Sequence, residues 1–230
     1  MAFSPNRSSI PTRRRWTTRV PVLFASLLLI AFVALAAPQN QDRDRDRDRD
    51  RDRDRDRDRI HISHERMSYD FGGGSGGRPS PDAMCEPGSV AIGFHVQVGQ
   101  YFNEAWLDCA RLRPNGWVGE ERSMTQRTGS RGGHRVQDAY CGEGRVLRGL
   151  QGRTGASIDE AAGECVSIRE LLERPNPRVE MTQSVRRPDA GGHPAEVQCP
   201  PGAVVTGFRS RSGAWMDHLW IVCSEVRGER

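Results

Sequence analysis

Two short glycine-containing motifs, each present three times, are the residues of this sequence best suited to bind a polyhydroxylated ligand. One places an acid or amide four residues after a glycine, as in Gly213-Ala-Trp-Met-Asp217, and the other is a Gly-Gly pair such as Gly76-Gly77. A carboxylate can accept hydrogen bonds from two adjacent hydroxyls, and backbone N–H groups can donate to the same hydroxyls where glycine leaves no Cβ in the way. An aromatic ring such as Trp215 can cover the apolar face of a sugar.

The copies of each motif differ in their side chains. The first motif occurs as Gly99-Gln-Tyr101-Phe-Asn103, Gly155-Ala-Ser157-Ile-Asp159 and Gly213-Ala-Trp215-Met-Asp217, and the Gly-Gly pairs are Gly76-Gly77, Gly132-Gly133 and Gly191-Gly192. Ser157 stands where the other copies have an aromatic residue, and Asn103 lacks the charge and one strong acceptor of the acid. We therefore expect the best site at Asp217. Gly and Asp also favour turns without any ligand, so a purely structural role is the alternative.

The motifs recur because the chain contains a threefold repeat. Three segments of equal length share both of their cysteines, one valine and three glycines. The segments are Cys85–Cys109, Cys141–Cys165 and Cys199–Cys223. Each begins with alternating apolar residues, such as Val90, Ile92 and Phe94 on one expected strand face, and continues through a glycine-rich middle to a second apolar stretch. This pattern predicts an antiparallel hairpin whose tip carries the first motif.

The six cysteines predict three disulfides. The two cysteines of each segment are expected to lie opposite each other at the open end of the hairpin, where opposed residues can meet disulfide geometry. The expected pairs are Cys85–Cys109, Cys141–Cys165 and Cys199–Cys223. Each would close a loop of about 25 residues and contribute about 3 kcal/mol. Zinc sites need more closely spaced cysteines, so neither a metal nor another cofactor is expected.

Further strands are expected between the hairpins, over Trp117–Gln126 and Arg178–Val185. Few residues follow Cys223, so the third copy lacks this strand. The segment Arg66–Phe71 can supply it, because it also leads into a Gly-Gly pair. A chain whose start completes its last copy predicts an all-β fold of three small sheets closed around a pseudo-threefold axis. Such closure buries the apolar faces and leaves few strand edges exposed.

The whole set of motifs resembles the jacalin-related lectins, and most closely their threefold-symmetric, griffithsin-like arrangement. The run Gly-Gly-Gly-Ser-Gly-Gly at 72–77 resembles the glycine loop of that family, and Tyr101 and Trp215 match the aromatic position of its second loop. The disulfides resemble those of vitelline membrane outer layer protein. The resemblance implies a β-prism of three Greek-key sheets with sugar sites at one end, and it suggests mannose as the sugar. The carbohydrate-binding sets that it implies are Asp217, Trp215 and Gly213 with Gly76 and Gly77; Asp159 and Gly155 with Gly191 and Gly192; and Asn103 and Tyr101 with Gly132 and Gly133.

The residues before the repeats are not expected to join the fold. Residues 1–37 end in an apolar run that begins at Val20 and contains a small-x-small pattern, which predicts a signal peptide or, if uncleaved, a membrane anchor. Residues 38–65 are expected to be a disordered linker, because Asp42–Arg59 is an Asp-Arg repeat whose charges cancel locally. The domain is then 66–230, with repeats at about 66–127, 128–186 and 187–230. Together with paired cysteines, the signal predicts a secreted, periplasmic or cell-surface protein.

Charge and motif content narrow the function. Residues 60–230 hold 20 arginines and 21 acidic residues, so the domain is near neutral and nucleic acid is not an expected partner. An enzyme is not expected either, because no nucleophile motif occurs and neighbours such as Asp159 and Glu160 point to opposite faces of a strand. The sequence therefore predicts a protein that binds glycans without catalysis. The alternative is a structural or protein-interaction module whose sugar-site loops are inactive.

Overall fold

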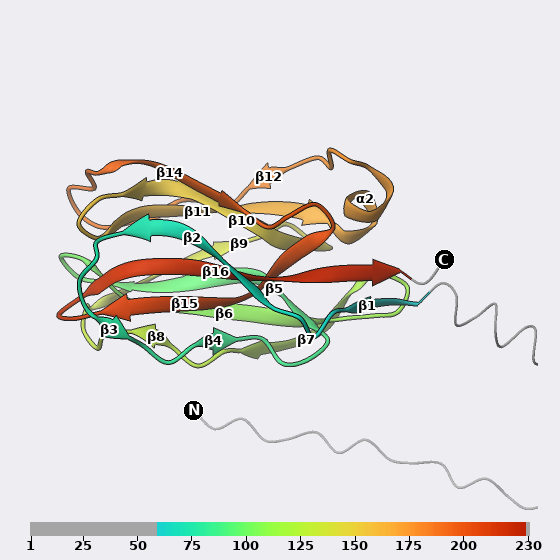
Figure 1. Ribbon diagram of the computed structural model, residues 1–230, viewed down its shortest axis with the longest axis horizontal. Helices are drawn as coiled ribbons and strands as arrows, with labels where there is room; N and C mark the ends of the chain where they lie inside the picture. The colour runs from blue at the N-terminus through green and yellow to red at the C-terminus, as the bar shows by residue number, and fades with distance from the viewer. Residues whose placement is uncertain (1–58, 229–230) are drawn as a thin grey trace, which may run out of the picture. The chain divides into compact units, whose positions relative to one another are not determined.

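Three antiparallel hairpins form the frame of the structure, a computed structural model that describes residues 59–228 (Figure 1). They are β5 (Ser89–Val98) with β6 (Phe102–Leu112), β10 (Arg145–Thr154) with β11 (Ile158–Ser167), and β15 (Ala203–Ser212) with β16 (Met216–Gly228). Each hairpin falls on one cysteine-to-cysteine segment, so the predicted hairpins are confirmed. The turn between β15 and β16 lies at the left end of the molecule in Figure 1.

Short outer strands complete a sheet around each hairpin. The sheet of β5 and β6 also contains β7 (Val118–Met124), β8 (Thr128–Gly129) and β9 (Arg135–Tyr140). The sheet of β10 and β11 also contains β12 (Glu180–Met181), β13 (Val185–Arg186) and β14 (His193–Gln198). The sheet of β15 and β16 also contains β1 (Ile60–Ile62), β2 (Met67–Gly73), β3 (Arg78–Pro79) and β4 (Ala83–Met84). The strands at the start of the described chain thus complete the sheet of the last hairpin. This pairing confirms the all-β fold of three sheets that the sequence predicts.

Strand β1 extends the domain further toward the N-terminus than expected. Ile60 pairs with Gly228 and Ile62 with Val226, and Ile62 is buried. Ordered β-structure therefore begins before residue 66, within the segment that the sequence assigned to the linker, because two apolar side chains follow the Asp-Arg repeat. The predicted signal segment and most of the repeat lie outside the described residues. Within residues 59–228, no helix is long and apolar enough to cross a membrane.

A bulge in the first strand of each hairpin meets the end of the last outer strand of the same sheet. The extra residue lies on the first strand, and its carbonyl accepts the N–H of the first cysteine of the next repeat. These bonds are Cys141 to Ile92 at 2.9 Å, Cys199 to Arg148 at 2.8 Å and Cys85 to Thr206 at 2.9 Å. Each bond extends the pairing within one sheet and links consecutive repeats of the chain, and the third bond links the last repeat to the first, so the three repeats form a closed ring.

The bulge also changes which side chains share a face. Val90 and Ile92 lie in one apolar cluster, whereas Phe94 lies in another. The expectation that these three residues share a face is therefore wrong, because a bulge inserts one residue and turns the rest of the strand over. The simple alternation that the sequence shows gives no sign of the inserted residue.

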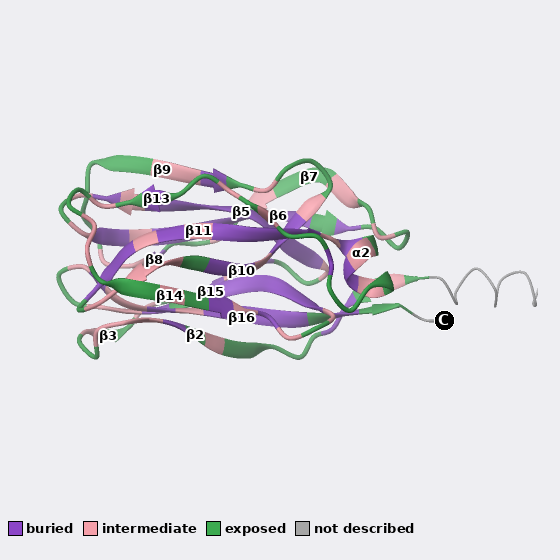
Figure 2. Cartoon of the chain, turned by 90° about the horizontal axis from the view of Figure 1, so that it is seen from above, coloured by how far each residue is buried: buried purple, intermediate pink, exposed green. Residues whose placement is uncertain are grey.

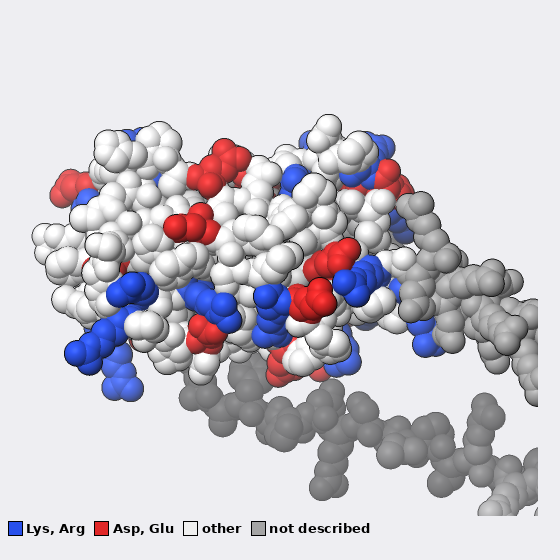
Figure 3. Space-filling view, viewed as in Figure 1, with Lys and Arg blue, Asp and Glu red and all other residues white. Residues whose placement is uncertain are grey.

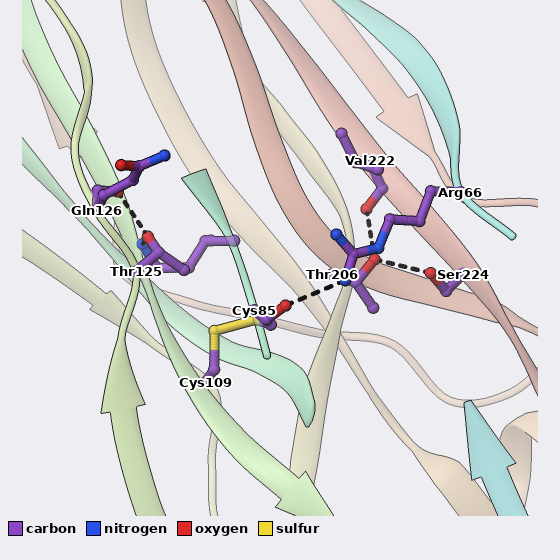
Figure 4. The surroundings of a disulfide bond; sticks show 9 residues. Arg66, Cys85, Cys109, Thr125, Gln126, Thr206, Val222 and Ser224 are labelled. Carbon is purple, nitrogen blue, oxygen red and sulfur yellow. Dashed lines mark hydrogen bonds between the residues drawn. A yellow bond between two sulfur atoms is a disulfide. The ribbon is translucent and has the colours of Figure 1, made fainter. Parts of the chain in front are cut away.

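The disulfides join neighbouring sheets. The bonds are Cys85–Cys109, Cys141–Cys165 and Cys199–Cys223, with Cα–Cα distances of 5.7, 5.6 and 5.7 Å, which confirms the predicted pairs. The partner opposite Cys109 in the hairpin ladder is nevertheless Ala91, not Cys85. Cys85 follows β4 of another sheet, and its carbonyl accepts a hydrogen bond from Arg66 at 3.1 Å (Figure 4). Each bond therefore ties the hairpin of one sheet to the last outer strand of its neighbour.

The core consists of two apolar clusters to which all three hairpins contribute. Phe94, Leu150 and Phe208 belong to the larger cluster, in which the rings of Phe94 and Phe208 meet edge to face at 6.0 Å. The smaller cluster contains a fully buried valine from the first strand of each hairpin and is extended by the helix α2 (Ile168–Glu173). Figure 2 shows the hairpin strands mostly buried, with exposed residues along β7, β9 and β14. The hairpin tips are therefore held on a packed frame.

Candidate functional site

The three hairpin tips share one backbone turn. In each, the glycine of the first motif donates its N–H to the carbonyl two residues later, and a register shift accompanies the turn. The bonds are Gly99 to Tyr101 at 3.0 Å, Gly155 to Ser157 at 2.9 Å and Gly213 to Trp215 at 3.0 Å. The same backbone turn therefore precedes the candidate ligand-binding residue of every copy, which is Asn103, Asp159 or Asp217.

The glycine loops close on these three residues. The second glycine of each Gly-Gly pair has a positive φ: 69° at Gly77, 77° at Gly133 and 67° at Gly192. A Cβ at Gly77 would lie 2.5 Å from Asp217 Oδ2, and one at Gly133 would lie 3.1 Å from Asn103 Oδ1. Gly192 approaches the Asp159 carboxylate in the same way. Only glycine allows both this backbone conformation and this approach. The structure thus places the second glycine of each pair beside the acid or amide that the family resemblance assigns to it, whereas Gly191 borders Arg187 and not Asp159.

The Asp217 carboxylate has no hydrogen-bond or ion-pair partner in the part of the chain that the structure describes. It lies between Gly76 and Gly213, where a Cβ would be 2.8 Å from Oδ1 and 3.4 Å from Oδ2 respectively. Oδ2 is buried under the glycine loop without a hydrogen bond, and within residues 59–228 no hydrogen bond or ion pair to Oδ1 is found. The Nε1 of Trp215 is also buried and unbonded. Buried polar atoms are nearly always hydrogen-bonded, so Oδ2 lacks a donor and Nε1 lacks an acceptor, and a ligand hydroxyl can serve as either.

The equivalent carboxylate of Asp159 is occupied by the protein itself. Asp159 is 3% exposed and forms an ion pair with the Nε of Arg187. The backbone N–H of Arg187 donates to the Asp159 carbonyl, as the N–H of Gly74 does to the carbonyl of Asp217. Arg187 therefore stands at the loop position that Gly74 holds at the other tip. The sequence interpretation missed this residue, although an arginine pair ahead of Gly191-Gly192 is visible in the sequence.

The third tip carries an amide. A Cβ at Gly132 would lie 2.7 Å from Nδ2 of Asn103, so the glycine loop closes on this side chain as it does at the other tips. Asn103 is 8% exposed. Its side chain can donate as well as accept, but it brings no charge. This tip therefore differs from that of Asp217 in chemistry and not in backbone geometry.

The aromatic residues of two tips stack on each other. The rings of Tyr101 and Trp215 have centroids 4.4 Å apart and planes inclined by 25°, and the guanidinium of Arg187 lies 5.5 Å from the Tyr101 centroid. The glycine loop also touches another tip, since a Cβ at Gly74 would meet the carbonyl of Ala156. All three tips therefore meet at one end of the molecule. Tyr101 covers one face of Trp215, and Trp215 as a whole is partly exposed.

A second polar cluster lies away from the tips, on β5, β6 and β9. His95 lies 2.6 Å from Asp138 and 3.1 Å from Asp108, and the Tyr140 hydroxyl is 3.2 Å from its Nε2. Partial burial and the neighbouring carboxylates, chiefly Asp108, raise the pKa of Tyr140 from 10.0 to about 12. The ring of His95 also stacks on Trp106 at 5.0 Å. These acids are satisfied by neighbours within the sheet, unlike Asp217.

Comparison with known proteins finds likeness only among solved structures, since no family model and no curated protein sequence matches the chain. Malaysian banana lectin is 14% identical, with 70% of this chain and 99% of that chain covered and a TM-score of 0.47. Artocarpin complexed with methyl α-mannose is 10% identical, with 70% and 99% covered and a TM-score of 0.49. A mannose-binding jacalin-related lectin from Ananas comosus is 14% identical, with 69% and 96% covered and a TM-score of 0.46.

These proteins include a jacalin-related lectin, the family that the motifs of this sequence resemble. At such identities the comparison concerns the fold. The arrangement of three sheets stands on the strand pairing of this chain itself. What the tips bind must be argued from their own geometry.

Proposed function

We propose that this protein binds carbohydrate without catalysis and that its principal site is the Asp217 tip. The observation that carries the proposal is the Asp217 carboxylate, which is enclosed by glycines and has no partner among the described residues. A hexose presents adjacent hydroxyls that can donate to both oxygens of a carboxylate. Hydroxyls reach Oδ1 directly, and they reach Oδ2 once the loop around Gly77 gives way slightly.

The neighbouring groups complete a polar sugar site. The backbone around Gly76 and Gly77 approaches the carboxylate without intervening side chains, so its N–H groups can donate to ligand oxygens. The exposed part of Trp215 can pack on the C–H groups of the ring. A single site of this kind is expected to bind a monosaccharide with a Kd of about 1 mM, or about −4 kcal/mol.

The tips are poorly arranged for glycoside hydrolysis. Hydrolysis by acid–base chemistry uses two carboxylates that flank one bond. Of the three equivalent tip positions, Asn103 is an amide and Asp159 is held by Arg187, which leaves Asp217 as the one free carboxylate among them. The arrangement therefore favours binding over turnover.

The test compares the oxidised chain with its Asp217→Asn variant by calorimetric titration of methyl mannoside, glucoside and galactoside. We expect selective binding of one or more of these sugars and a loss of at least about tenfold in affinity in the variant, because an amide lacks the charge and one acceptor. Asp189→Asn is the matched control. It makes the same change at the same end of the molecule, and asparagine tolerates the φ of 54° found there.

Two outcomes would contradict the proposal. Equal weakening in both variants would show that Asp217 has no special role. A folded protein with all three disulfides that binds no glycan would instead favour a structural or protein-interaction module built on the same frame.

We also propose that the protein is exported before it folds. The three disulfides use all six cysteines, and disulfides persist in oxidising compartments. The apolar run at residues 20–37 lies outside the described residues, and it has the composition of an export signal. Cell fractionation with N-terminal sequencing tests this: mature protein in the cytoplasmic fraction with reduced cysteines would contradict it.

A further inference from the structure

We infer that the second tip carries a separate site for the carboxylate or sulfate group of an acidic saccharide, formed by Arg135, Arg186 and Arg187. This inference goes beyond sugar binding at Asp217 and does not depend on it. The second repeat has a different loop where the third sheet has Gly73-Gly74, and this loop carries two of the arginines.

Strand register identifies the replaced residues. Arg186 pairs with Glu160, as Gly73 pairs with His218 and Gly129 with Glu104 in the other sheets. Arg186 and Arg187 therefore occupy the places that Gly73-Gly74 and Gly129-Ser130 hold elsewhere. The loop is also two residues longer before its Gly-Gly pair, counted from these equivalent positions to Gly191 and to Gly76. Two glycines have thus been exchanged for two cations in a wider loop.

The wider loop borders a cavity. Its volume is about 600 Å³, and its lining includes Arg135, Gln137, Ser184, Arg186, Arg187 and Asp189. Ligand sites typically enclose roughly 300–1,000 Å³, so a sugar residue fits and a lone inorganic anion would fill only part of the space. The polar lining suits a saccharide better than an apolar ligand.

The charge balance of the cavity favours an anion. Neither guanidinium of Arg135 and Arg186 has an acidic partner within residues 59–228, and Asp189 is the acidic residue of the lining. Some arginines elsewhere in the domain do have acidic partners, since Arg127 lies 2.9 Å from Glu104 and Arg209 lies 3.0 Å from Asp82. On the face drawn in Figure 3, arginine side chains also gather at the end where β15 turns into β16. The cavity therefore carries two guanidinium charges, from Arg135 and Arg186, that no acid of the described structure neutralises.

The arginines are attached to a fixed frame. The side chain of Gln137 donates to the Arg186 carbonyl at 2.7 Å and accepts from the Arg186 N–H at 3.2 Å, which fastens β13 to β9. Arg187 is held by Asp159. Guanidinium groups form paired, charge-assisted hydrogen bonds to planar carboxylates and to sulfates. An acidic sugar residue can therefore bind with little rearrangement of the loop backbone.

The test measures binding of trigalacturonate, a sulfated trisaccharide and neutral maltotriose to the oxidised full chain. We expect both acidic probes to bind, with affinity that falls as salt is added, and the neutral probe to bind at least about tenfold more weakly. The variant Arg135→Gln/Arg186→Gln should weaken acidic binding at least about tenfold. Arg111→Gln/Arg169→Gln is the matched control, because it removes the same charge from exposed residues far from the tips and should change binding less than about twofold.

The outcomes separate this inference from the proposed function. Asp217→Asn should leave acidic binding unchanged, and Arg135→Gln/Arg186→Gln should leave binding of a neutral monosaccharide unchanged. If both double variants lost equal affinity for the acidic probes, the overall charge of the protein would explain the binding, and the inference would be overturned. Inorganic sulfate that binds as tightly as the sulfated trisaccharide would overturn the saccharide part of it. Unfolding midpoints equal to that of the parent chain would show that the variants are folded.

Discussion

The tips of Asp217 and Asp159 share a backbone and differ in what satisfies the carboxylate. Both acids follow the same turn and face a glycine with positive φ. The Asp217 carboxylate has no partner in the described structure, whereas Asp159 is paired with Arg187. The fold therefore builds a carboxylate site in both repeats, and one loop residue decides whether the site stays open or is closed from within. Equivalent loops on one fold can therefore carry different binding sites while the fold itself stays the same.

The largest expected effect comes from opening the closed tip. Arg187→Ser leaves Asp159 buried and unpaired, and removing one partner of a buried ion pair costs about 4 kcal/mol. Denaturant unfolding measures this loss. Arg209→Ser is the control, because Arg209 and Asp82 have side chains 47% and 41% exposed and such surface pairs contribute at most about 1 kcal/mol.

A second variant shows whether the charge of Asp159 is the cause. Asp159→Asn/Arg187→Ser removes both charges, so it should recover most of the lost stability. If the double variant were as unstable as Arg187→Ser, packing of the arginine would explain the loss, and the comparison of the two carboxylates would fail.

Removing a disulfide should affect the three repeats equally, in contrast to changes at the tips. Cys141→Ala/Cys165→Ala and Cys199→Ala/Cys223→Ala each open a loop of about 25 residues and should cost about 3 kcal/mol. Both bonds join neighbouring sheets through the same positions, which is the reason to expect equal losses. Unfolding of each variant by denaturant provides the values. Losses that differ by more than about 1 kcal/mol would show that the frame has diverged together with the tips.

A substitution at Gly77 is expected to lower stability less than removal of a disulfide does, but to weaken sugar binding. Gly77→Ala places a methyl group 2.5 Å from both Asp217 Oδ2 and the carbonyl carbon of Ser212, in a backbone with φ of 69°, and it should cost about 2 kcal/mol. Gly144→Ala is the control, because Gly144 has a φ of 70° with no atom near its would-be Cβ, so it carries the backbone cost of about 1 kcal/mol without the contact. Sugar titration should show at least about tenfold weaker binding for Gly77→Ala and no change for Gly144→Ala. Equal binding by both variants would separate the glycine loop from the site.

The sequence predicts the frame well because the frame is repeated. Three copies of equal length predict the hairpins, the disulfide pairs and the use of β2 to complete the last sheet. The bulge escaped prediction, since one inserted residue such as Ile92 leaves no mark on an alternating apolar pattern. The strand at Ile60 was missed because it is short and adjoins the Asp-Arg repeat.

The differences between the tips were less predictable than their positions. The sequence pairs Asp159 with Gly192 correctly in space, but it gives no distance between Arg187 and the carboxylate. That contact depends on the register of β13, which places an arginine where another loop has Gly74. The stack of Tyr101 on Trp215 likewise joins residues that are far apart in the chain. Contacts between repeats are set by closure of the ring and not by any local pattern.

The smallest expected effect concerns Asp108, an acid that is hydrogen-bonded within its sheet and lies away from the tips. Burial and Asp108 raise the pKa of Tyr140 from 10.0 to about 12, so the folded state favours the neutral phenol. The stability that this provides is fully present below pH 10 and is lost as the pH rises from 10 toward 12. Tyrosinate absorbance should show a step near pH 12 that Tyr140→Phe removes. Asp108→Asn should move the step toward lower pH, because Asp108 adds to the effect of burial, whereas Asp217→Asn should leave it in place, because Asp217 lies at the tips and is not among the groups that raise this pKa. A step that moves in both variants would show that the charges of the tips and of the sheet are coupled.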